Sequence, residues 1–322
     1  MTTALKHLVL VAALHLLATA AGAQSYPDRP VKLMIGFAPG SSADVSSRIL
    51  AEELSRLLGQ RVIVEVRAGA SSNIAADTVA KAEPDGYTLF LGSAANVINR
   101  SMRAAAAVDI GRDLKPVALV CALPNILVVH PDVKASSVAE LIALAKAEPD
   151  KLNYGSPGIA TSPHLSAELF KVMAGVRMVH VPYTGTAQAA QDLLAGRLHL
   201  MFSPASTALP HIEAKTLRAL AWTMTTRGPS LPDLPTVAEA GLPGFDTSIW
   251  FGINAPPGLP DAIATRLADA IATAVAGDVM VRAFRVQGIE PLSGGPAVYA
   301  SYIAAETAKW TDVVAKAGLA KP

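Results

Sequence analysis

The chain contains a single cysteine, Cys121, so it cannot form an internal disulfide. Its stability must come from a hydrophobic core, and a chain of 322 residues is long enough to build two of them. Cys121 lies in the apolar run LVCAL, where we expect a small buried hydrophobic residue. With no cysteine pair and no closely spaced histidines, we expect neither a metal site nor a cofactor.

Charged and aromatic residues are also scarce. Asp, Glu, Lys and Arg make up 16% of the chain and nearly balance, with a net charge of +1. A nucleic-acid-binding protein would usually carry a basic stripe, so we expect no nucleic-acid partner. Aromatic residues are only 5% of the chain, which argues against a stacking platform for bases or sugars.

The motifs of common enzymes are missing. The chain has neither a P-loop nor a G-x-G-x-x-G fingerprint after its first strand. Around Ser156, Tyr154 replaces the first glycine of a nucleophile elbow, and Pro157 would remove a donor from the oxyanion hole. His164 begins a helix beside a small-residue loop, where it either contacts a ligand or holds its own loop. We therefore predict a protein that is not an enzyme.

Residues 1–23 have the pattern of a cleaved secretory signal peptide. Lys6 and His7 precede an apolar run over residues 8–21, and Ala-Gly-Ala at 21–23 fits the cleavage site. The run is short for a membrane span, and no cysteine follows it as in a lipoprotein. We expect export to the periplasm, with Gln24 at the mature N-terminus; an uncleaved anchor is the alternative.

The rest of the chain is organised like residues 31–44. An apolar strand over 31–35 is followed by a loop of small residues and then by an amphipathic helix that Ser41 or Ser42 can cap and that we expect to end at Gly59. Uncapped N–H groups and the helix dipole at such a position favour anions.

The same order of strand, small polar loop and helix recurs along the chain, with loops at 68–73, 93–96, 157–164, 184–186 and 203–207. It predicts an α/β fold with mainly parallel sheets covered by helices, and ligands at the carboxyl ends of the strands. These loops offer neutral donors, which suits a small polar or carboxylate ligand held between two units. Tyr183, at a strand end, is either a buried tyrosine or a ligand contact.

We expect two domains, one of them discontinuous. Residues 24–125 form the first part of domain I, and residues 126–245 form domain II. The proline-rich stretch 228–235 is expected to be a surface connector, and 236–241 a short helix. Two helices over 260–276 and 298–317 are too few for a third domain, so 246–322 is expected to return to domain I.

Several motifs resemble one protein family. They are YPDRP at 26–30, FAPG at 37–40 with Asp44, PDGYTL at 84–89, LNYGS at 152–156, VPYTG at 181–185 and LPDLPTVAEAG at 231–241. Together they make the mature chain similar to the substrate-binding receptors of tripartite tricarboxylate transporters, the Bordetella uptake gene family. The resemblance implies a type II periplasmic-binding-protein fold, with a ligand cleft between two lobes and crossing segments near 122–128 and 246–253. It implies a monomeric receptor that passes a small organic acid to an integral-membrane permease.

The resemblance also points to ligand-binding positions on both lobes. We add His164 to these positions because it begins a helix beside a small-residue loop. The candidate residues are Phe37, Ala38, Gly40, Ser41, Ser42, Ser93, Asn96, Ser156, Thr161, His164, Tyr183, Gly185 and Ser203.

The chain departs from the family pattern at several of these loops. Ser41 and Ala43 stand where the family prefers glycine and threonine, and Ser71–Ser72 replace a glycine pair. Ile159, Thr184 and Ser203 stand where polar, lysine and aspartate residues are common, and they are expected to make the cleft more apolar and less charged. We therefore expect a ligand with an apolar or aromatic part. Two other functions remain open: a ligand sensor for a signalling partner, and a periplasmic enzyme on the same fold.

Overall fold

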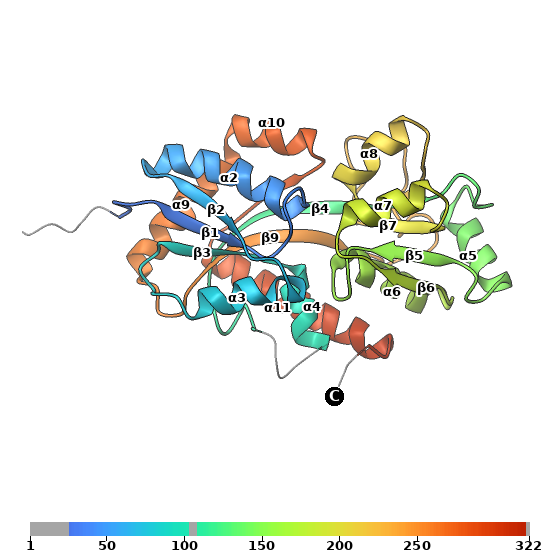
Figure 1. Ribbon diagram of the computed structural model, residues 1–322, viewed down its shortest axis with the longest axis horizontal. Helices are drawn as coiled ribbons and strands as arrows, with labels where there is room; N and C mark the ends of the chain where they lie inside the picture. Colours follow the sequence, from blue (N-terminus) through green and yellow to red (C-terminus); the bar gives the residue numbers. More distant parts are fainter. Residues whose placement is uncertain (1–25, 103–107, 320–322) are drawn as a thin grey trace, which may run out of the picture.

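The computed structural model describes residues 26–102 and 108–319, which form two lobes joined by long strands (Figure 1). The predicted signal peptide lies outside the described residues. The strands are β1 (Val31–Ile35), β2 (Val62–Val66), β3 (Thr88–Ser93), β4 (Lys115–Val129), β5 (Asn153–Ser156), β6 (Val179–Pro182), β7 (Leu200–Pro204), β8 (Arg218–Trp222), β9 (Ser248–Ala255) and β10 (Glu290–Gly294). The helices are α2 (Ser42–Leu58), the 3-10 turn η1 (Ala70–Ser72), α3 (Asn73–Ala80), α4 (Ala94–Met102), α5 (Val138–Ala147), α6 (Ser162–Ala174), α7 (Thr186–Leu194), α8 (Ala205–Glu213), α9 (Asp261–Ala276), α10 (Asp278–Val286) and α11 (Pro296–Lys316).

Strand β4 connects the sheets of the two lobes. The strand order is β2-β1-β3-β9-β4-β7-β5-β6, and β8 and β10 also pair with β4. In lobe I, β1 runs parallel to β2 and β3, whereas β9 is antiparallel to β3 and β4. In lobe II, β5 runs parallel to β6 and β7. From Lys115 to Pro124, β4 pairs with β9; from Asn125 onward it pairs with β7, so the chain changes lobe within one strand.

The predicted domain boundaries fall on these connecting strands. The boundary at 125/126 lies inside β4, and the boundary at 245/246 lies just before β9. Both strands run from one lobe toward the other in Figure 1. Where the domains divide remains a prediction.

Helices cover both faces of each sheet, as the sequence predicts. In lobe I, α2, α9 and α10 enclose one apolar cluster, and α3, α4 and α11 pack on the other face around Trp250, Tyr299 and Trp310. In lobe II, α5 and α6 cover one face while α7 and α8 cover the other. Cys121 is fully buried in the lobe I core, which confirms its expected role as a small hydrophobic residue.

The local signals at α2 are confirmed. The Ser41 hydroxyl accepts a hydrogen bond from Asp44 N–H and caps the helix, and Gly59 ends it in the left-handed conformation with φ 70°.

Three predicted segments are wrong. Residues 94–96 and 205–207 are not loops: β3 and β7 pass directly into α4 and α8, because alanines open both helices and favour helical geometry. Residues 236–241 form turns in place of a short helix, and Thr236 N–H pairs with the Glu239 carboxylate. Two elements were not predicted from the sequence. One is β10, a short edge strand, and the other is α10, a helix that only Gly277 separates from α9.

Candidate ligand-binding cleft

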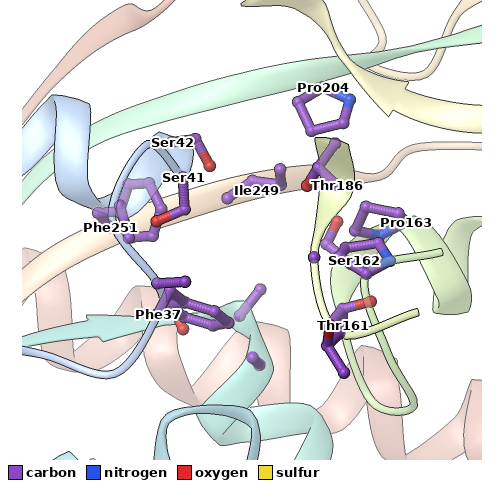
Figure 2. A pocket seen from close by; sticks show the side chains of 18 residues that line it. Phe37, Ser41, Ser42, Thr161, Ser162, Pro163, Thr186, Pro204, Ile249 and Phe251 are labelled. Carbon is purple, nitrogen blue, oxygen red and sulfur yellow. The ribbon is translucent and has the colours of Figure 1, made fainter. Parts of the chain in front are cut away.

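A cavity that is partly open to solvent lies between the two lobes, with about 620 Å³ of empty space when the open solvent at its mouth is included. Figure 2 shows Phe37, Ser41, Ser42 and Phe251 on one side, and residues of lobe II on the other. Ile249 lies between the two sides, on the crossing strand β9. The lining residues are Phe37, Ala38, Ser41, Ser42, Ala43, Ser93, Ala94, Ala95, Pro157, Thr161, Ser162, Pro163, Thr184, Gly185, Thr186, Pro204, Ile249 and Phe251.

Seven of the residues predicted from the sequence line this cavity: Phe37, Ala38, Ser41, Ser42, Ser93, Thr161 and Gly185. Six others lie near the cavity but do not line it: Gly40, Asn96, Ser156, His164, Tyr183 and Ser203. The sequence reasoning missed Ile249 and Phe251, because a fully buried strand gives no alternation that would mark which side chains face a cleft.

Helix N-termini surround the cavity. The lining includes the cap or first turn of α2, α4, α6, α7 and α8, which come from both lobes. Among the described residues, no side chain caps α6, α7 or α8, so N–H groups at these ends remain available to a ligand. Helix N-termini carry partial positive charge, so the cavity favours an anion although none of its described lining residues is ionisable.

The first loop of lobe I is held in place by Asp44. Its carboxylate accepts hydrogen bonds from Gly40 N–H at 3.0 Å and from Arg48 Nε at 2.8 Å. Gly40 adopts a left-handed φ of 78°, which glycine tolerates without strain. Gly40 therefore shapes the loop that presents Ser41 and Ser42 to the cavity.

Asn96 orients Ser93 from behind the wall. The Asn96 side-chain oxygen accepts hydrogen bonds from both the N–H and the hydroxyl of Ser93, each at 3.1 Å. Asn96 is fully buried, and its amide nitrogen has no hydrogen-bond partner among the described residues.

A stack of rings supports the wall of lobe II. His180 packs between Tyr154 and His164, with ring centroids 4.9 and 4.2 Å away. His180 Nε2 lies 2.7 Å from the Ser156 hydroxyl, which accepts a hydrogen bond from Gly158 N–H. Burial lowers the pKa of His164 to about 4 and that of His180 to about 3, so both rings are neutral at pH 7. His164 therefore stacks on His180 and does not line the cavity, and its Nδ1 has no hydrogen-bond partner among the described residues.

Tyr183 and Ser203 are also turned into lobe II. The Tyr183 hydroxyl donates to Asp192 Oδ2 at 2.7 Å, and burial together with this carboxylate raises the pKa of Tyr183 to about 12. Ser203 lies inside β7 and is almost fully buried.

Of the three departures from the family pattern that are expected to make the cleft less polar, only Thr184 lines the cavity. Ile159 is 45% exposed, and Ser203 is buried within β7. The apolar lining comes from Phe37, Ile249 and Phe251, together with three prolines.

The profile of the tripartite tricarboxylate transporter family receptors matches residues 46–319. The chain belongs to this family. It is 38% identical over 291 residues to the UPF0065 protein in the tcbD-tcbE intergenic region of Pseudomonas sp. strain P51, covering 90% of this chain and 87% of the relative. It is 36% identical over 304 residues to the protein BugT of Bordetella pertussis, covering 94% and 93%.

Solved structures of the same kind share the fold. One is R. palustris Rpa4515 with adipate, at TM-score 0.85 and 38% identity, covering 91% of this chain and 98% of that one. Another is MatC from Rhodopseudomonas palustris with bound malate, at TM-score 0.82 and 29% identity, covering 90% and 100%. The periplasmic binding protein BugD has a TM-score of 0.84 at 31% identity, covering 92% and 100%. The predicted two-lobed periplasmic-binding-protein fold is therefore confirmed.

Within residues 26–102 and 108–319, no helix is both long enough and apolar enough to cross a membrane.

Proposed function

We propose that this protein is a periplasmic receptor that captures a small organic carboxylate between its lobes and delivers it to a membrane permease. The observation that carries the proposal is the convergence of five helix N-termini, from both lobes, on one cavity. A carboxylate there accepts hydrogen bonds from backbone N–H groups and needs no cationic side chain.

The lining also suggests the rest of the ligand. Phe37 and Phe251 present apolar surface on the lobe I side of the cavity, and Ile249 presents it between the two sides. No described lining residue is acidic, so the cavity has no counter-charge for an ammonium group. We therefore propose a carboxylate with an apolar body and without an amine. Adipate, in the related structure, has this character.

Native mass spectrometry of protein purified from its own host tests the proposal directly, because a co-purified ligand would appear as added mass. Thermal unfolding with adipate, malate, benzoate, citrate and glutamate then ranks the acids. A bound acid at about 100 times its dissociation constant stabilises the protein by roughly 2.7 kcal/mol. We expect adipate or benzoate to stabilise the protein more than citrate or glutamate. No added mass and no stabilisation by any of these acids would refute a carboxylate receptor.

Delivery needs a separate experiment. We expect membranes that contain the permease to retain the protein more strongly when its ligand is present. Equal retention with and without ligand would contradict ligand-dependent delivery.

A further inference from the structure

A second contact joins the lobes, away from the crossing strands. The Ser71 hydroxyl of lobe I donates a hydrogen bond of 2.9 Å to the main-chain oxygen of Ile159 in lobe II, 88 residues away. Next to it, Ala160 is 3% exposed and packs into the lobe I cluster that contains Ala75, Ala94 and Val97. The contact therefore combines one hydrogen bond with apolar packing, to which Leu165 of α6 also contributes.

Unfavourable backbone conformations gather at this contact. Six non-glycine residues in the described ranges have a positive φ, and four of them lie here: Ala70, Ser71, Ser72 and Ala160, with φ 47°, 49°, 77° and 63°. Residues other than glycine adopt the left-handed backbone conformation at a cost in free energy, and they keep it only where the surrounding structure holds them.

The surroundings on the lobe I side can be identified. The Asn99 amide donates to the carbonyl oxygens of Ser71 at 2.9 Å and Ala70 at 3.4 Å, which fixes the turn from α4. Ser72 is fully buried against Gly36: a Cβ on Gly36 would lie only 2.1 Å from the Ser72 hydroxyl oxygen. The loop is therefore held in a shape that glycine would adopt more easily, and this shape directs the Ser71 side chain toward lobe II.

We propose that Ser71 is a clasp residue: by donating to the Ile159 carbonyl, its hydroxyl stabilises the arrangement of the lobes seen in this structure, which we take as the closed one. A glycine at this position would be free of strain but would have no hydroxyl to reach across. The role concerns the lobes alone, so it does not depend on which ligand is bound.

Distances between the lobes of the ligand-free protein test this role. Fluorophores on Glu52→Cys in α2 and Lys146→Cys in α5 report lobe separation, since both positions are exposed and the native Cys121 is buried. We expect Ser71→Ala to lower the closed-to-open ratio about two- to fivefold, the modest effect of one partly exposed hydrogen bond. Ser230→Ala, at an exposed serine in the connector, should leave the ratio unchanged.

Ser71→Gly separates the hydroxyl from the backbone strain. It removes the same hydroxyl but relieves the left-handed conformation, so it should fold at least as stably as Ser71→Ala and open the lobes to a similar extent. If both variants have the same closed-to-open ratio as the natural protein, the proposal is wrong. Opening by Ser71→Ala with none by Ser71→Gly would also overturn it, because the hydroxyl would then be irrelevant.

Discussion

A negative charge placed at Ser42 should stabilise the free protein and weaken ligand binding. Ser42 is the first residue of α2 and lines the cavity. An aspartate in the first turn of a helix interacts favourably with the helix dipole, typically by about 0.3–1 kcal/mol. The same carboxylate would stand where we propose that the ligand's own carboxylate binds. Ser42→Asp should therefore change stability and affinity in opposite directions.

The expected loss of affinity follows from Coulomb's law. Two unit charges about 6 Å apart repel by roughly 2.8 kcal/mol at an effective dielectric constant of about 20, and by roughly 0.7 kcal/mol in bulk water. The cavity is partly open to solvent, so the repulsion should fall between these limits. This corresponds to an affinity that is about 3- to 100-fold lower, decreasing toward the lower value as salt is added.

Calorimetric titration with the tightest-binding acid of the panel measures this effect, and thermal unfolding of the free protein measures the stability. Ser42→Asn is the matched control, because it has nearly the same shape as aspartate and no charge. We expect the asparagine variant to bind several times more tightly than the aspartate variant. Equal affinities of the two variants would refute the anion site at α2, since shape alone would then explain the loss.

Three further predictions concern other parts of the site. Asp44→Asn should lower the free energy of unfolding by about 1–2 kcal/mol, because it weakens the hydrogen bonds to Gly40 and Arg48. Arg48→Ala removes only an exposed ion-pair partner and should lower it by less than about 1 kcal/mol. Urea unfolding measures both values. Burial lowers the pKa of His164 to about 4 and that of His180 to about 3, so below pH 6.5 the unfolded chain binds more protons than the folded one. The free energy of unfolding should therefore fall from pH 6.5 toward pH 4. His164→Phe should make this fall shallower in denaturation curves measured across that pH range. Thr186→Pro removes the first N–H of α7, whereas Thr186→Val removes only the side-chain hydroxyl. Thr186→Pro should therefore weaken acid binding more than Thr186→Val does. Equal losses of affinity would show that the side chain, and not the N–H group, contacts the acid.

Much of the fold could be predicted because its signals are local. The strand over 31–35, the Ser41 cap and the Gly59 helix end each depend on a few neighbouring residues, and all three are confirmed. The errors came where neighbouring elements join without a loop. Alanines after β3 and β7 resemble small loop residues in composition, yet they begin helices as soon as the strand ends.

The cavity was harder to predict because its walls depend on how elements cross. Phe251 is the register partner of both Ser93 in β3 and Cys121 in β4, and this pairing brings Phe251 to the cleft. Nothing in residues 248–255 marks that position, since every residue of β9 is buried. His164 and Ser156 were selected because they lie next to a loop of small residues, but proximity in sequence did not reveal that their side chains turn inward to His180.

Prolines at the cleft distinguish the N–H donors that the helices of lobe II offer to an anion. Pro163 in the first turn of α6 has no N–H to donate, and Pro204 takes the cap position before α8. Helix α7 instead begins after Gly185, with Thr186 and two further non-proline residues in its first turn. Helix α7 therefore offers more N–H donors to the cavity than α6 does. On the lobe I side of the cavity, the N-terminus of α2 supplies Ser41 and Ser42. We expect the ligand to lie between α2 and α7, so that closing the lobes brings two positive helix ends onto one anion.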